Sequence, residues 1–110
     1  MSNATTWLDQ LFKFPGGTVS LNEGDAARVE DATNLVNTFN VIYTGALTAN
    51  RTVTFPLPTS DEQSYNRSVF NDTTGGYAII VSVGVGTTVT LNAGVCRLLT
   101  FEPAGVRMGG

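Results

Sequence analysis

The side chains that most often carry catalysis are scarce in this sequence. Histidine is absent from all 110 residues, which removes the general base of Ser-His-Asp and Cys-His sites and also the commonest metal ligand. Cys96 is the single cysteine, so no internal disulfide can form and no neighbouring base is evident to activate the thiol. We therefore expect Cys96 to be a small, buried apolar residue.

Carboxylates are the remaining candidates for chemistry. Asp61 and Glu62 are neighbours in a polar segment, and with Asp72 they leave a small glycan-processing or metal enzyme as the residual alternative to a solvated loop. The acidic segment 22–25 lacks the alternating ligand spacing of a calcium loop, and Gly84-Val85-Gly86 is followed by a strand pattern rather than a helix, so both read as turns. The sequence predicts a protein that is not an enzyme and has no catalytic residue, cofactor or metal site.

The charge and hydropathy of the sequence limit the kinds of partner that this chain is expected to bind. Charged residues make up 14% of the chain, against about 25% in ordinary soluble domains, so little repulsion keeps neighbouring copies apart. The net charge is −3 and the six basic residues are scattered, which disfavours a nucleic-acid partner. No secretory signal pattern and no apolar run near the ~20 residues of a membrane span is present, so we expect a soluble protein with no membrane partner.

The elements that would position these residues are short strands. Thr, Asn, Gly and Val are abundant, as is typical of strands and tight turns. Turn clusters separate seven short runs with strand character, at residues 18–21, 34–43, 51–55, 65–70, 77–83, 87–91 and 95–101. This spacing predicts an all-β protein, a small jelly-roll-like β-sandwich over residues 18–110. The run 34–43 alternates between a core face and a wet face, and the apolar run 77–83 predicts a central or covered strand.

The N-terminal segment has helical periodicity instead. Apolar residues share one face of a short amphipathic helix at 4–14, and Pro15-Gly16-Gly17 ends it, so residues 1–17 are predicted to form a helical arm. A helix this short is marginal alone, and its apolar face is therefore covered either by its own domain or by another chain. Under the second alternative the partner-binding residues are Trp7, Leu8, Leu11, Phe12 and Phe14.

One part of the sequence resembles a known group of proteins. Residues 44–56, Thr-Gly-Ala-Leu-Thr-Ala-Asn-Arg-Thr-Val-Thr-Phe-Pro, are similar to the Gly-x-Leu-Thr-Ala-Asn-Arg-Thr-Val-Thr-Leu-Pro segment of tailed-bacteriophage virion proteins, in particular tail-fibre, head-fibre and capsid-decoration modules. The turn at 71–75 and the strand patterns that follow it up to residue 101 keep the same order. Residues 102–105 depart from the resemblance, because the family usually has a polar Asp-Gly turn there.

This resemblance implies a structural part of a phage particle. The favoured function is a capsid decoration (cement) protein, made in the host cytoplasm and located on the capsid exterior of the virion. Its expected partners are the major capsid protein and further copies of itself, as a homotrimer. The alternative is a tail-fibre or head-fibre module that binds a host surface glycan or receptor. Fibre proteins are usually long chains with shafts and repeats, and this sequence shows neither, which favours decoration.

Overall fold

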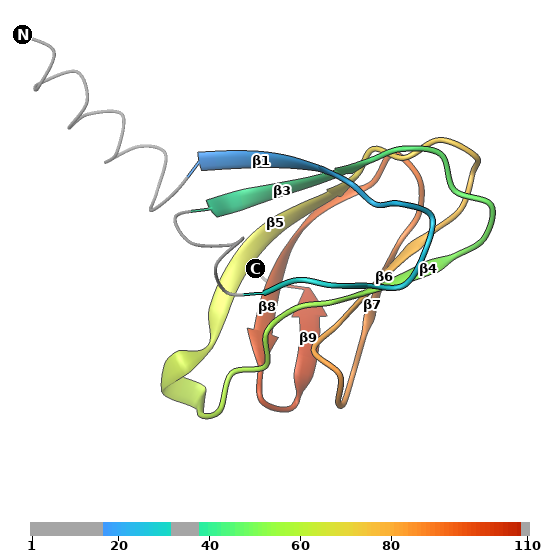
Figure 1. The fold of residues 1–110 in the computed structure, drawn as a ribbon. Coiled ribbons are helices and arrows are strands. Elements are labelled where there is room, and N and C mark those ends of the chain that lie inside the picture. The colour runs from blue at the N-terminus through green and yellow to red at the C-terminus, as the bar shows by residue number, and fades with distance from the viewer. Residues whose placement is uncertain (1–16, 32–37, 109–110) are drawn as a thin grey trace, which may run out of the picture.

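A computed structural model describes residues 17–31 and 38–108 (Figure 1). The elements of these residues are β1 (Gly17–Asn22), β2 (Arg28–Val29), β3 (Thr38–Thr44), β4 (Arg51–Thr54), the 3-10 helix η1 (Asp61–Gln63), β5 (Tyr65–Asn71), β6 (Ile79–Ser82), β7 (Val89–Leu91), β8 (Cys96–Glu102) and β9 (Gly105–Met108). The all-β prediction is confirmed. The predicted helical arm and its partner-binding residues Trp7, Leu8, Leu11, Phe12 and Phe14 lie outside the described residues.

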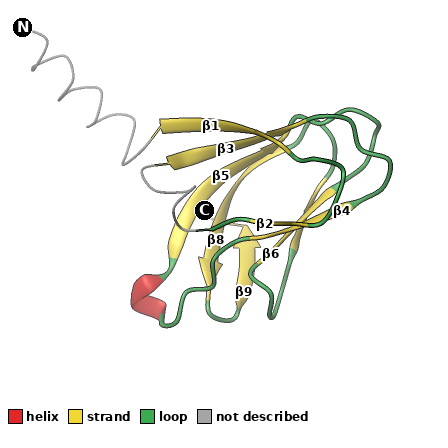
Figure 2. Ribbon diagram, in the orientation of Figure 1, coloured by secondary structure: helices red, strands yellow, loops and turns green. Residues whose placement is uncertain are grey.

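The strands form two mixed sheets that pack face to face (Figure 2). One sheet has five strands in the order β1-β3-β5-β8-β9, and the other has four in the order β2-β4-β6-β7. The first six strands alternate between the sheets, so β1, β3 and β5 run parallel to one another, as do β2, β4 and β6. The last three strands pair antiparallel with their neighbours.

This connectivity does not show the jelly roll that the sequence predicted. Jelly rolls are built from antiparallel strands linked as Greek keys, whereas four of the seven strand pairings here are parallel. The physical reason lies in the crossings between sheets. A chain that crosses to the opposite sheet before it returns runs in the same direction each time, so the first part of the fold is a two-layer coil.

The core lies between the sheets, where both inner faces are apolar. Val41 and Tyr43 of β3 are fully buried, as predicted, although Thr38, on the face that was expected to be wet, is buried as well. In the facing sheet, Ile79 and Val81 of β6 are also fully buried, and β6 lies between β4 and β7, as expected of a central strand. Aromatic packing joins the layers, since the ring centroids of Phe55 and Phe101 are 4.7 Å apart.

One end of the sandwich is closed by contacts between the two sheets. The Thr87 carbonyl, just before β7, accepts a hydrogen bond from Val106 N of β9 at 2.9 Å, and Thr87 N donates to Ala104 O at 3.3 Å. Gly105 makes this approach possible: its φ is +132°, and a Cβ there would lie 2.3 Å from Thr87 N. β1 and β2 are the edge strands that begin the two sheets, away from this closure.

Candidate functional site

The structure does not bring the candidate carboxylates together. Asp61 and Glu62 are exposed in η1, whereas Asp72 is exposed just after β5. The seven residues of β5 separate them, which at about 3.3 Å per residue is about 20 Å. Among residues 17–31 and 38–108, no three His, Cys, Asp or Glu side chains are grouped so that they could hold a metal ion. Asp61 and Glu62 are thus solvent-exposed, in a 3-10 helix.

Cys96 is exposed, and the prediction of a buried thiol was wrong. The β5–β8 register places Cys96 opposite Phe70, and its Sγ lies 3.3 Å from Ser68 Oγ on the outer face of the five-stranded sheet. The inward positions of β8 belong to Leu99 and Phe101, which are fully buried. The run 95–101 has apolar residues at both parities, so its sequence could not show which set faces the core.

The acidic segment 22–25 is a turn, as predicted. Asn22 Oδ1 accepts a hydrogen bond from Gly24 N at 2.9 Å. The Asp25 carboxylate accepts hydrogen bonds from Thr48 N and Thr48 Oγ1, each at 2.8 Å, and from Arg51 Nε at 3.0 Å. These hydrogen bonds, those from Thr48 above all, hold the pKa of Asp25 below its usual value. The carboxylate therefore ties this turn to the start of β4.

A second carboxylate is enclosed by the core. Glu30 follows β2 directly, and its side chain is 0% exposed. Arg28 Nε lies 2.9 Å from Glu30 Oε1, and the Tyr43 hydroxyl donates a hydrogen bond to Glu30 Oε2. Burial, together with the hydrogen bond to Glu30, raises the pKa of Tyr43 far above its usual value. The hydroxyl therefore remains a proton donor, and both Glu30 oxygens have partners.

Glu23 takes the equivalent position after β1. Its main-chain N–H donates to Thr44 O of β3 at 2.9 Å, as Glu30 N–H donates to Thr54 O of β4 at 2.8 Å. Glu23 is only 3% exposed; Oε1 accepts from Ala26 N at 3.2 Å, but Oε2 has no hydrogen-bond partner among the described residues. Burial raises the pKa of this carboxyl above its usual value of 4.5. The main chains of both glutamates therefore bond to the neighbouring strand of their own sheet, and the Glu30 side chain alone links the two sheets, through Tyr43.

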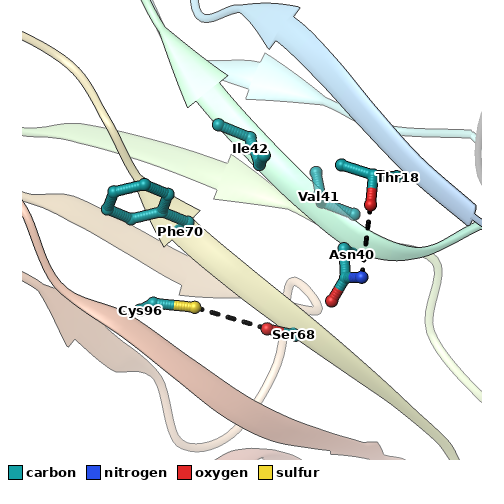
Figure 3. Close-up of a pocket in the computed structure, with 7 residues that line it drawn as sticks. All are labelled: Thr18, Asn40, Val41, Ile42, Ser68, Phe70 and Cys96. Atoms are coloured by element: carbon teal, nitrogen blue, oxygen red, sulfur yellow. Dashed lines mark hydrogen bonds between the residues drawn. The ribbon is translucent and has the colours of Figure 1, made fainter. Parts of the chain in front are cut away.

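The outer face of the five-stranded sheet carries a small hollow (Figure 3). Its lining residues come from β1, β3, β5 and β8 and are Thr18, Asn40, Val41, Ile42, Ser68, Phe70 and Cys96. The strand register explains the gathering, because it aligns Thr18, Asn40 and Ser68 in one row and Ile42, Phe70 and Cys96 in the next. The volume is about 180 Å³, below the roughly 300–1,000 Å³ of ligand pockets, so the hollow suits a single side chain.

Apolar surface extends from the hollow along β8. Leu98, opposite Ser68 in the register, is 41% exposed, and it lies on the same outer face as the half-buried Ile42 and Phe70. We call Ile42, Phe70, Leu98 and the hollow the outer-face patch. Apolar groups rimmed by polar side chains on a sheet face are typical of protein–protein contacts.

Sequence reasoning did not find the outer-face patch or the two buried glutamates. A signal for the patch existed, because Ile42 lies between the inward Val41 and Tyr43, and Phe70 follows the inward Val69, so both faces of these strands are apolar. No comparable signal exists for Glu23 and Glu30, since each follows a strand in what reads as a turn.

Comparisons with known proteins add no identification. No family model, no curated protein and no solved structure matches this chain. No helix among residues 17–31 and 38–108 is long and apolar enough to cross a membrane. The fold and the outer-face patch therefore describe the class: an all-β protein of two mixed sheets with an apolar patch on one outer face.

Proposed function

We propose that this chain is a capsid decoration (cement) protein of a tailed bacteriophage. It is made in the host cytoplasm, assembles as a homotrimer, and binds the major capsid protein on the outside of the shell. The observation that supports a protein partner is the outer-face patch, whose hollow suits one side chain and whose lining carries no lysine, arginine, aspartate or glutamate. The choice of a phage particle comes from the sequence resemblance.

The fold explains why the residues of segment 44–56, which carries the resemblance, take this pattern. Leu47, Val53 and Phe55 are buried in the core, Asn50 Oδ1 accepts from Ala78 N at 2.9 Å, and Arg51 pairs with the Asp25 carboxylate at 2.9 Å. The pattern therefore encodes β4 and its crossings rather than a binding surface. A related protein could keep this segment while its outer faces bind different partners.

Decoration would act by mass action. A protein that binds the assembled shell but not separated subunits stabilises the shell by RT ln(1 + [L]/Kd) at each site, about 2.7 kcal/mol when its concentration is 100 times Kd. Sedimentation of purified shells that lack the protein, with and without the chain, tests this directly. Co-sedimentation together with a raised shell melting temperature is the expected result.

The outer-face patch can be tested with the exposed thiol of Cys96 as a reporter. In the free protein, Cys96 should react readily with a thiol reagent, and the reaction should slow when shells are added because the hollow is covered. Leu98→Gln should weaken shell binding, whereas Leu57→Gln, at a side chain of similar exposure (44% against 41%), should leave it unchanged. Equal labelling rates with and without shells, in a sample where the chain co-sediments, would place the contact elsewhere.

The arm is the second proposed contact. We propose that Trp7, Leu8, Leu11, Phe12 and Phe14 act as anchors, because large apolar side chains dominate binding energy where one chain grips another. Deletion of residues 1–15 should leave folding and oligomerisation intact and abolish co-sedimentation. Loss of folding in this variant would instead assign these residues to the domain's own core.

The alternative is a tail-fibre or head-fibre module. Such a protein would not bind capsid shells and would bind a host surface glycan or receptor. Binding of the purified chain to host-cell envelopes, with no co-sedimentation with shells, would move the proposal to this class.

A further inference from the structure

We propose that β1 is a self-association edge, through which two copies of this chain pair antiparallel about a two-fold axis at Ser20. The contact joins the two five-stranded sheets into one continuous sheet. It requires only β1 and holds whether or not the protein decorates a capsid. The partner that pairs with the free edge of β1 is a second copy of the chain.

β1 lacks most of the features that protect sheet edges. Native edge strands are usually very short, bulged, or interrupted by charge or proline. β1 is six residues long, Gly-Thr-Val-Ser-Leu-Asn, with no charge and no proline, and its pairing with β3 is irregular only between Gly17 and Thr18. No strand of the described residues lies beyond it. Its outward main-chain groups are therefore a template for another strand.

The other edges of the described fold are better protected. β9 carries Arg107, which forms an ion pair with Glu102, and Thr87 bridges β9 to the opposite sheet. β2 has only two residues and β7 three. β2 also carries Arg28, which forms an ion pair with Glu30, although its Val29 is 77% exposed. β1 is therefore the longest uncharged edge strand of the described residues.

The register of β1 identifies a second copy as a fitting partner. Val19 and Leu21 pair with the inward Val41 and Tyr43, and directly opposite residues of antiparallel strands share a face. The regular part of β1 is Thr18–Asn22, and its midpoint is Ser20. Pairing about Ser20 places Val19 opposite Leu21 of the second copy on the inner face.

The same register also pairs compatible side chains on the outer face of the joined sheet. Ser20 lies opposite Ser20 of the second copy, and Thr18 lies opposite Asn22, so small polar groups meet one another. A shift by one residue would set apolar side chains opposite polar ones on the wrong face. Because β1 has no charge, identical strands do not repel each other, which is the condition that self-pairing imposes.

Disulfide trapping provides a direct test of this geometry. Residues directly opposite in an antiparallel pair have Cα atoms about 4.5 or 5.5 Å apart, within the roughly 4.4–6.8 Å that a disulfide spans. Ser20→Cys, made in the full chain with Cys96→Ser, should therefore form a covalent dimer under mild oxidation. The matched control is Asn66→Cys in the same background, because residue 66 is exposed on the outer side of the central strand β5.

A charge variant tests the contact without a cross-link. Ser20→Lys sets two ammonium groups opposite each other and should weaken self-association by up to about fivefold, whereas Ser20→Thr should not. Sedimentation velocity gives the mass of the assembly, which is compared with the chain mass of 11.6 kDa. A dimer or a hexamer contains the two-fold contact through β1. A trimer without larger species agrees with the proposed decoration protein but not with this contact.

A chain that sediments only as a monomer or only as a trimer would overturn the proposal, and so would three further outcomes. The first is trapping of Ser20→Cys no faster than Asn66→Cys. The second is self-association of Ser20→Lys that equals that of Ser20→Thr. The third is a full-length chain that does not pair although a variant starting at Gly17 does, because residues 1–16 of the same chain would then occupy the edge. Shell binding is measured separately, so failure of this contact and failure of the proposed function are distinguishable.

Discussion

Asn71 offers the sharpest test of how this fold is held together. It ends β5 and is fully buried. Its side-chain amide donates to Leu91 O at 2.9 Å and to Tyr77 O at 3.2 Å, while Oδ1 accepts from Thr73 N at 3.1 Å and from the Thr73 hydroxyl. One amide therefore joins the end of the five-stranded sheet to β7 and to the loop before β6.

The cost of Asn71→Leu follows from these contacts. Leucine has the same branching and the same number of side-chain heavy atoms but cannot make any of the four hydrogen bonds. The contacts to Leu91 O and to Thr73 are buried, and each buried polar group left without a partner costs about 1–3 kcal/mol. The two buried main-chain groups alone, Leu91 O and Thr73 N, give a loss of about 4 kcal/mol, against a total stability of about 5–15 kcal/mol for a domain of this size.

Urea denaturation of the wild type and the variant measures this loss. With a slope near 1.5 kcal/mol per molar, about 4 kcal/mol lowers the midpoint by roughly 2–3 M. The control is Asn66→Leu on the same strand. The Asn66 side chain is exposed and accepts a hydrogen bond from the Thr100 hydroxyl at the surface, so a change within about 0.5 kcal/mol is expected. If both substitutions shift the midpoint equally, the reasoning about Asn71 is wrong.

Two further predictions concern a buried carboxyl and a glycine. Because burial raises the pKa of Glu23 above 4.5, the folded state binds a proton more tightly than the unfolded chain, so stability falls as pH rises from about 4.5 through the raised pKa. Glu23→Gln should therefore be more stable than the wild type at neutral pH, and the difference should shrink towards pH 4; a melting-temperature difference that is constant with pH would contradict this. Gly105→Ala should cost the roughly 1–2 kcal/mol of a positive φ plus the clash with Thr87, whereas Gly76→Ala, at φ +81° with nothing within 4 Å, should cost the backbone strain alone. Equal denaturation midpoints for the two alanine variants would show that the approach to Thr87 does not require glycine.

Most of the strands were predictable because their signals are local. Each of the seven predicted runs overlaps a strand of the structure, although β3 can be compared only from Thr38 onward. β2 and β9 were missed: β2 has two residues, and β9 follows a turn that reads as the end of the last run. The inward set Val41 and Tyr43 was predicted because their alternation is regular.

The predictions that failed or fell short all depend on which strands become neighbours. Cys96 was expected inside, but the register with Phe70 places it outside. The outer-face patch depends in the same way on β1, β3, β5 and β8 lying side by side. Its residues are far apart in the sequence, and no local pattern relates them.

By itself, the sequence determined the all-β class, the position of most strands and the scarcity of catalytic side chains, because composition and period-two alternation are properties of each segment. The tertiary structure alone decided the parallel coil, the burial of Glu23 and Glu30, and the gathering of Ile42, Phe70 and Leu98 on one face. These features follow from pairing between strands distant in the chain. The residues of a regularly alternating strand specify the face that it buries, but they do not specify the neighbour that it pairs with.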